Sequence, residues 1–381
     1  MMYFSPGSHL FRLVTVLSLV GEYPTTSLQL LGDRQELGRL VQKLTQPQLI
    51  RNSATGEKLC VKVINLSGKS PCTTIRLSRF ALPLLDWIGT REYYESRFTR
   101  SGMSSSKTHH ERSYRVAETA VMLLRAGIEC RPWMLPALQM QRRALIIDRP
   151  MALLARDVKQ IEPESVNKTK YARYTGALFT PASCMAVYNT RNAVMRWNGE
   201  GEFKARQDLI QIARNNSGCS QLDTAVLLGQ DYSVALDTIR CKDAWRGKMQ
   251  RFDSIYPHVC FVPLQDFGVR QLAIMRLPDW KEQILDLLFD EDTRSDNKGA
   301  FEYDALEDNT YLFSFLDGDI ARLIRFHDAI RNTKLHCKVI AYPEQISFLQ
   351  SCLPASVEYY DIPIDQIEQG LEVKARSLLD G

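Results

Sequence analysis

Residues 8–44 carry apolar side chains at steps of three and four, which is the spacing of one helix face. We expect a helix over residues 8–20 that ends at Gly21, and a short second helix over residues 24–31 that ends at Gly32. A third helix is expected over residues 33–44, with Asp33 and Glu36 as a capping-box-like pair at its start. Its apolar stripe consists of Leu37, Leu40, Val41 and Leu44.

After Pro47 the period changes from helical to extended. Residues 48–52 and 58–66 are predicted to form two strands around a turn at 53–57, and residues 74–77 are expected to add a third strand before a helix over 81–88. Three helices followed by a β-hairpin is the order of a winged helix-turn-helix. The pattern therefore predicts a DNA-binding type of fold for the N-terminal part.

The remainder of the chain mixes strands and helices without an internal repeat. Residues 93–107 are predicted to be a linker or mobile arm, and 109–126 a helix. Beyond residue 150 we expect strands over 172–180, 184–189, 193–197, 225–228, 258–263, 271–277, 311–316, 335–341 and 357–360; helices over 201–215, 319–331 and 365–380; and an acidic loop over 291–309. The fold class is thus α+β, with a winged helix-turn-helix over 1–90, a linker and helical extension over 91–150, and a mixed α/β domain over 151–381.

Composition places the chain among ordinary globular proteins, with 45% hydrophobic and 24% charged residues. No run approaches the roughly 20 apolar residues of a membrane span. The short apolar run 13–20 lacks the cleavage pattern of a signal peptide, so a cytoplasmic location and no membrane contact are expected. Nine scattered cysteines without a C-x-x-C pair predict reduced thiols and no cysteine-bound metal.

Charge is distributed unevenly along the chain. Residues 1–130 carry 17 Lys and Arg against 10 Asp and Glu, whereas residues 281–381 carry 10 against 20. The positive charge of residues 1–130 favours a polyanionic partner. The acidic C-terminal region is a candidate surface for a protein partner. The alternative interpretation is that these charges only lie on a solvated surface and bind no partner, because such a surface would have the same charge pattern.

The third helix carries the residues that we expect to contact DNA. Gln35, Arg39 and Gln42 suit adenine and guanine edges in the major groove, and Arg34 and Lys43 suit phosphates. The hairpin is the expected wing, with Arg51 and Lys58 as further DNA contacts. In the alternative, this basic helix binds no ligand and only packs against the rest of its domain, or the domain binds a protein instead of DNA. Winged-helix proteins often bind paired half-sites, so a homodimer is also expected.

Three segments carry a family resemblance: the run ending in KLTQPQLIR (37–51), IRLSRFALPLL (75–85) and HHERSYRVAETAVMLLRAGI (109–128). Together they resemble the winged-helix domain of plasmid replication-relaxation proteins, over the N-terminal segment as far as Cys130. Ala81 stands near the place where that family has a glycine. The resemblance implies a double-stranded DNA-binding protein of a plasmid or integrative conjugative element, acting in replication, relaxation or transcriptional control, with no cofactor.

The order of elements in the second domain resembles a restriction-endonuclease-like core, which raises a Mg²⁺-dependent nuclease as the alternative function. Glu202-Phe203-Lys204 has the spelling E-x-K, but we expect Glu202 at a helix start, where the helix dipole favours a carboxylate. Asp317-Gly318-Asp319 offers two carboxylates, but Asp319 is expected to cap a helix. We therefore assign no catalytic residue and no metal ligand. Phosphate-binding-loop and hydrolase motifs do not occur in the sequence.

Overall fold

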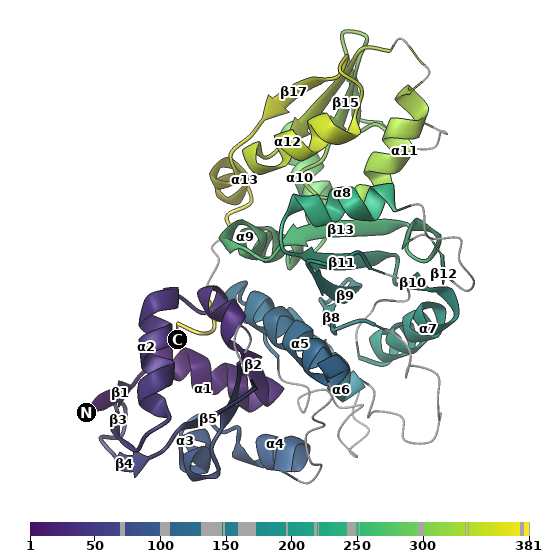
Figure 1. The fold of residues 1–381 in the computed structure, drawn as a ribbon. Helices are drawn as coiled ribbons and strands as arrows, with labels where there is room; N and C mark the ends of the chain where they lie inside the picture. Colours follow the sequence, from purple (N-terminus) through teal and green to yellow (C-terminus); the bar gives the residue numbers. More distant parts are fainter. Residues whose placement is uncertain are drawn as a thin grey trace. The chain divides into compact units, whose positions relative to one another are not determined.

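The computed structural model describes residues 1–68, 73–99, 107–130, 147, 149–158, 173–195, 197–216, 219, 221–241, 249–250, 252–295, 301–331, 333, 335–373 and 377–380. The chain divides into two compact units (Figure 1). The first consists of Met1–Cys130 together with Arg376–Gly381, and the second of Arg131–Ala375. The mixed α and β content agrees with the predicted fold class.

The first unit contains the three predicted helical segments, which follow a short first strand. Helix α1 (His9–Val20) starts at Ser8, whose hydroxyl accepts the N–H of Phe11, and ends at Gly21 with a φ of 79°. The second segment is a 3₁₀ helix, η1 (Thr25–Leu30), and the third is α2 (Arg34–Leu44). Asp33 caps α2 by accepting the N–H groups of Gln35 and Glu36.

The predicted capping box is only half formed. The Glu36 carboxylate does not return to the backbone of Asp33, because it lies 3.0 Å from the Nε2 atom of His9, at the start of α1. This contact ties the first turns of α1 and α2 together.

Two three-stranded sheets follow, where the sequence pattern predicted one. Strands β1 (Met2–Phe4), β3 (Gln48–Asn52) and β4 (Lys58–Val61) form the first, in the order β1-β3-β4. Strands β2 (Glu22–Pro24), β6 (Thr74–Leu77) and β5 (Ile64–Ser67) form the second, in the order β2-β6-β5. The predicted strand over 58–66 is therefore two strands, and 74–77 does not join the hairpin. The break lies at Val63, which is buried and donates its N–H to Leu44 O at 3.2 Å.

The predicted linker over 93–107 is helical as far as Thr99. After η2 (Arg79–Ala81) and α3 (Leu82–Asp86) come α4 (Arg91–Tyr94) and a π-helical segment, η3 (Glu95–Thr99). Tyr94 and Phe98 are buried, with ring centroids 5.1 Å apart. Burial of these rings stabilises helical structure in a segment whose polar composition had predicted a linker. Residues 100–106 lie outside the described part. Helix α5 (Lys107–Arg125), predicted as a helix over 109–126, packs against α1 within the first unit.

The polar helix predicted over 365–380 is also shorter than expected. Helix α13 (Ile364–Gly370) ends within the second unit, and the last described residues return to the first. There Leu379 is buried and accepts the N–H of Gly7 at 3.2 Å. Burial of Leu379, together with the ion pair of Asp380 with Arg12, attaches this segment to the first unit.

A five-stranded sheet forms the core of the second unit, in the order β13-β11-β9-β8-β7. Its strands are β7 (Met151–Leu154), β8 (Gly176–Phe179), β9 (Cys184–Arg191), β11 (Thr224–Gly229) and β13 (His258–Pro263). The predicted β8–β9 hairpin is present, and β9, β11 and β13 run parallel, connected by α7 (Gly199–Asn216) and α8 (Tyr232–Arg240). Shorter elements are α6 (Ala155–Val158), β10 (Trp197–Asn198), β12 (Met249–Gln250) and η7 (Phe252–Ser254).

A four-stranded sheet completes the second unit, in the order β14-β15-β16-β17. Its strands are β14 (Ala305–Glu307), β15 (Thr310–Ser314), β16 (Cys337–Ala341) and β17 (Glu358–Asp361), connected by α11 (Ile320–Ile330) and α12 (Pro343–Cys352). A single apolar core contains side chains of both sheets, Phe261 of β13 and Phe313 of β15 among them.

Three predictions for the second unit are wrong. The expected strand over 271–277 belongs to helix α9 (Asp266–Met275), whose side chains are buried nearly all round, so it shows no helical alternation. The expected strand over 193–197 is reduced to β10, which begins at Trp197. The acidic segment 291–309, predicted as a loop, contributes β14. Helix α10 (Trp280–Leu288) was not predicted.

Candidate nucleic-acid interface

Helix α2 has one buried face and one exposed face. Leu37, Val41 and Leu44 are buried against the rest of the first unit. The side chains predicted to contact DNA are all exposed: Arg34, Gln35, Arg39, Gln42 and Lys43. Because residues 35, 39 and 42 lie within about one quarter of the helix circumference, opposite the buried stripe, they form a single polar ridge.

Both ends of α2 are fixed in place. At its start, Asp33 accepts two backbone N–H groups, and the Glu36 carboxylate contacts His9. At its end, Leu44 O accepts the N–H of Val63, between β4 and β5. The polar ridge is therefore carried by a helix anchored to α1 at one end and to the strands at the other.

The β1-β3-β4 sheet has an exposed face with a defined row of side chains. Register places Tyr3 of β1 beside Arg51 of β3, and Arg51 directly opposite Lys58 of β4. All three residues are exposed, Tyr3 by 54%, while Ile50 and Asn52 on the other face are buried. We call Tyr3, Arg51 and Lys58 the wing row. A second pair, Leu49 and Cys60, is exposed on the same face.

The turn of the hairpin is built by Asn52 and Gly56. The Asn52 side-chain oxygen accepts the N–H of Ala54 at 2.9 Å, and the Asn52 backbone carbonyl accepts the N–H of Gly56. Gly56 has a φ of 75°, a conformation that side chains other than glycine, asparagine or aspartate disfavour. The geometry of this turn fixes the register that brings Arg51 opposite Lys58.

The cations of this surface differ from the other arginines of the first unit in their partners. Three arginines elsewhere in the unit form ion pairs: Arg12 with Asp380 at 2.5 Å, Arg76 with Glu22 at 2.7 Å and Arg91 with Asp86 at 2.9 Å. Within the described residues, no ion pair or side-chain hydrogen bond occupies five cations of α2 and the hairpin: Arg34, Arg39, Lys43, Arg51 and Lys58. These five cations thus leave uncompensated positive charge on α2 and the hairpin, although Lys62 and Arg79, elsewhere in the described part of the unit, form no ion pair either.

Sequence reasoning named the cations and amides of this surface by periodicity and chemistry but missed Tyr3. Its signal in the sequence is only the short alternation of Met2, Tyr3 and Phe4. Tyr3 gains its neighbours by parallel pairing with β3, a strand that follows only after α1, η1 and α2. A contact of that range cannot be read from local pattern.

In the second unit, Glu202 occupies the first turn of α7, as predicted, and is fully buried. Its carboxylate accepts the N–H of Arg173 at 2.9 Å and the hydroxyl of Tyr188 at 2.7 Å. Lys204, the other charged residue of the E-x-K spelling, points instead to Glu200 at 2.7 Å. The two residues therefore do not converge.

Asp319 caps α11, as predicted, and its carboxylate also contacts residues outside that helix. Its Oδ1 atom accepts the N–H groups of Val259, Ala321 and Arg322. Its Oδ2 atom lies 2.7 Å from His258 Nδ1 and 3.1 Å from Lys281 Nζ. Burial raises the pKa of Asp319, but the charge of Lys281 and the bond from His258 outweigh burial, so the pKa lies well below the usual range.

Asp317 is similarly occupied. Its Oδ1 atom accepts the N–H of Asp319, and its Oδ2 atom pairs with Arg322 at 2.9 Å. The oxygens of both carboxylates thus already have protein donors. Sequence reasoning missed His258 and Lys281 as partners, because neither lies near Asp319 in the chain.

Within the described residues, no group of three His, Cys, Asp or Glu side chains is placed to bind a metal ion. Among the helices of that same part, none has the length and apolar character to cross a membrane. Comparison with known proteins found no matching family model, no matching curated protein and no matching solved structure.

Proposed function

We propose that the first unit binds double-stranded DNA, with α2 in the major groove and the β3–β4 hairpin on the adjacent backbone. The observation that carries this proposal is the set of five cations without ion pairs on these two elements, whereas Arg12, Arg76 and Arg91 elsewhere in the unit are each paired with a carboxylate. Unpaired Lys and Arg that neutralise phosphates release counterions, and this release drives protein–DNA association.

The order of elements supports a winged-helix arrangement. Helix α1, strand β2, the 3₁₀ helix η1, helix α2 and the β3–β4 hairpin follow one another along the chain (Figure 1). With 11 residues, α2 is about 16 Å long, which suits the major groove. Gln35, Arg39 and Gln42 on the polar ridge then contact base edges.

The wing row provides the sequence-independent contacts. Arg51 and Lys58 lie directly opposite one another, so a phosphate between them would receive donors from both strands of the hairpin. Arg34 and Lys43, at the two ends of α2, add phosphate contacts on either side of the base-reading side chains.

The wider role follows from the resemblance of three segments before Cys130 to plasmid replication-relaxation proteins. On that basis we propose a DNA-binding protein of a plasmid or integrative conjugative element, active in replication, relaxation or transcriptional control. Two copies on paired half-sites, and a protein partner for the acidic C-terminal region, belong to the same proposal.

A salt titration with matched variants tests DNA binding. Fluorescence anisotropy of a labelled duplex of about three helical turns is measured for the wild type and for the double variant Arg51→Gln/Lys58→Gln. The control Arg240→Gln/Arg331→Gln removes two exposed cations from the second unit. We expect the first variant alone to reduce the slope of log K against log salt by about two. Equal slopes for all three proteins would refute the proposed interface. Nicking of supercoiled DNA with Mg²⁺ would instead support the nuclease.

A further inference from the structure

The exposed face of the β1-β3-β4 sheet combines cations with apolar side chains. Arg51 and Lys58 share this face with Tyr3, Leu49 and Cys60, all of them exposed, Tyr3 by 54% and Leu49 by 43%. We call these five residues the wing face. Phosphate contacts account for its two cations but give no role to its aromatic ring or to Leu49. The wing face therefore has a property that binding of a DNA backbone alone does not explain.

Strand register places the apolar and the basic side chains of the wing face next to one another. Tyr3 is paired with Arg51, Arg51 lies opposite Lys58, and Leu49 lies opposite Cys60. Neighbouring strands of a sheet are about 4.8 Å apart, and residues two positions apart on one strand are about 7 Å apart. A planar ring stacked on Tyr3 would therefore lie about one strand spacing from Arg51, so ring binding and phosphate binding are possible at adjacent points.

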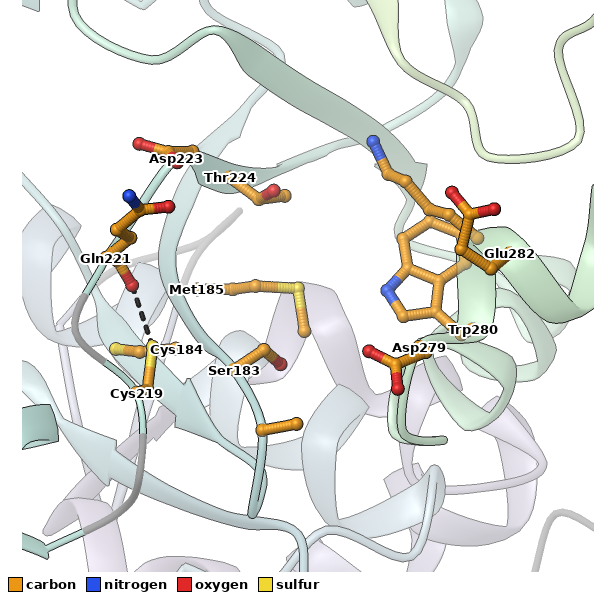
Figure 2. A pocket seen from close by; sticks show the side chains of 12 residues that line it. Ser183, Cys184, Met185, Cys219, Gln221, Asp223, Thr224, Asp279, Trp280 and Glu282 are labelled. Atoms are coloured by element: carbon orange, nitrogen blue, oxygen red, sulfur yellow. Dashed lines mark hydrogen bonds between the residues drawn. The ribbon is translucent and has the colours of Figure 1, made fainter. Parts of the chain in front are cut away.

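A pocket of about 390 Å³ in the second unit lacks this combination (Figure 2). It lies between the starts of β9 and β11 on one side and the first turn of α10 on the other. Among the described residues that line it, Trp280 is the one aromatic side chain and is only 7% exposed. Lys281, the one cation among those same residues, is paired with Asp319 at 3.1 Å. The pocket thus offers a nucleic acid neither an accessible ring nor an unpaired cation.

An unpaired nucleotide matches the chemistry of the wing face better than a duplex does. A duplex keeps the faces of its bases stacked on one another, so its outer surface offers Tyr3 no ring to stack on. In a single strand each base exposes its π face, aromatic side chains stack on such bases, and nearby Lys and Arg bind the backbone. Tyr3 beside Arg51 and Lys58 is an arrangement of this kind.

A second copy of the chain fits the wing face less well. A two-fold contact through this face would bring the same surface of both copies together. Arg51 and Lys58 of one copy would then lie near the same two cations of the other, and neither is paired with a carboxylate within the described residues. Four cations held close together repel one another, whereas a polyanion neutralises them. The charge of the face therefore favours a nucleic-acid strand.

We propose that the wing face binds an unpaired DNA strand, so that the preferred ligand of the first unit is a duplex with a single-stranded extension. The proposal rests on the proposed function: α2 holds the duplex, and the wing face binds the strand that leaves it. A base of this strand stacks on Tyr3, Leu49 packs against a neighbouring nucleotide, and Arg51 and Lys58 bind its phosphates. Because stacking uses a face that every base has, the extension is bound with little sequence preference.

Fluorescence anisotropy of the full chain with three kinds of labelled probe tests the ligand. They are a blunt duplex, the same duplex with an extension of about ten nucleotides at its 5′ or 3′ end, and the same extension made of abasic residues. We expect one extended duplex to bind at least about fivefold more tightly than the blunt one, and the abasic extension, which keeps the phosphates but lacks bases, to lose most of this gain. Equal affinity for blunt and extended duplexes, or an equally effective abasic extension, would overturn the proposal while leaving duplex binding intact. Absence of binding to every probe would refute duplex binding as well.

Variants of Tyr3 test the residue assignment. Tyr3→Ala should reduce the ratio of affinities, extended over blunt duplex, to about one, and Tyr3→Phe should preserve it, because stacking needs only the ring. The matched control is Tyr360→Ala in β17 of the second unit, where the tyrosine is 53% exposed; this variant should keep the wild-type ratio. An unchanged ratio in Tyr3→Ala would overturn the assignment. A dimer in sedimentation velocity that Tyr3→Ala abolishes without changing the ratio would show that a second copy covers the face instead.

Discussion

Arg51 and Lys58 face each other directly across the β3–β4 hairpin, both exposed and neither paired with an acidic side chain in the described part of the chain. Like charges in opposite positions of a sheet destabilise it. The hairpin therefore tolerates a repulsion that an anion placed between the two side chains would relieve. This relationship favours the proposed DNA-binding surface over a merely solvated face.

The first prediction concerns the opposing effects of removing one of these charges. Lys58→Gln should raise the free energy of unfolding by about 0.2–1 kcal/mol, because the repulsion from Arg51 disappears. The same change should weaken binding to every duplex and reduce the salt slope by about one. Urea unfolding and anisotropy measure the two effects. Loss of both stability and affinity would point to a structural role for Lys58.

The second prediction concerns sequence reading by α2. Arg39→Ala should reduce the preference for a selected site over random DNA by about 1–3 kcal/mol if Arg39 forms a bidentate contact with guanine. Arg331→Ala, an exposed cation of the second unit, should leave that preference unchanged. Selection of bound fragments from randomised DNA, followed by footprinting, provides the comparison. A footprint that survives both Arg39→Ala and Gln42→Ala would contradict the assignment of the reading helix.

The third prediction concerns Gly38, in the middle of α2. A Cβ atom added there would meet no other atom within 4 Å. Gly38→Ala should therefore stabilise the unit by about 1 kcal/mol, the difference in helix propensity between the two residues. Urea unfolding measures this gain. If stability rises while DNA affinity falls, Gly38 is a point of close approach to the duplex; if both rise, it is not.

The fourth prediction uses two native cysteines as reporters. Cys60 is exposed on the same face of the hairpin as the wing row, and Cys241 is exposed in the second unit. Bound duplex should protect Cys60 from maleimide and leave Cys241 reactive. Peptide mapping by mass spectrometry resolves the individual thiols. Equal alkylation of Cys60 with and without DNA would place the duplex away from the hairpin.

The fifth prediction concerns the stability that Asp319 contributes. Asp319→Asn retains a cap for α11 but leaves Lys281 without its closest carboxylate. We expect a loss of about 3–5 kcal/mol at pH 7, the usual effect of removing one partner of a buried pair. Asp237→Asn, an exposed residue of α8, is the control and should change little.

The same variant should alter the response to acid. The pKa of Asp319 is lowered in the folded state, so its contribution is present above the unfolded value of about 3.9 and is lost as the pH falls toward the folded value. The wild type should therefore lose more stability than Asp319→Asn between neutral pH and about pH 3. Parallel losses in urea unfolding across this range would show that the carboxylate contributes no stability that depends on pH.

Much of the fold was predictable because it depends on local signals. Helices α1 and α2 have apolar stripes with steps of three and four and identifiable caps at Ser8 and Asp33. Helix α9 was mistaken for a strand because burial on nearly all sides removes the alternation on which such predictions rest. The split between β4 and β5 was missed because a single backbone contact, from Val63 to Leu44, redirects the chain.

The sequence by itself determined the polar ridge of α2, because the spacing of Leu37, Val41 and Leu44 leaves only one side of the helix for Gln35 and Arg39. Only the tertiary structure decided which groups surround Arg51, Lys58 and Asp319. Register placed Tyr3 and Lys58 on either side of Arg51, and packing brought Lys281 to Asp319 from a distant part of the chain. Helical periodicity is a property of neighbouring residues, whereas ion pairs and strand register arise from contacts between segments far apart in the chain, which no local pattern encodes.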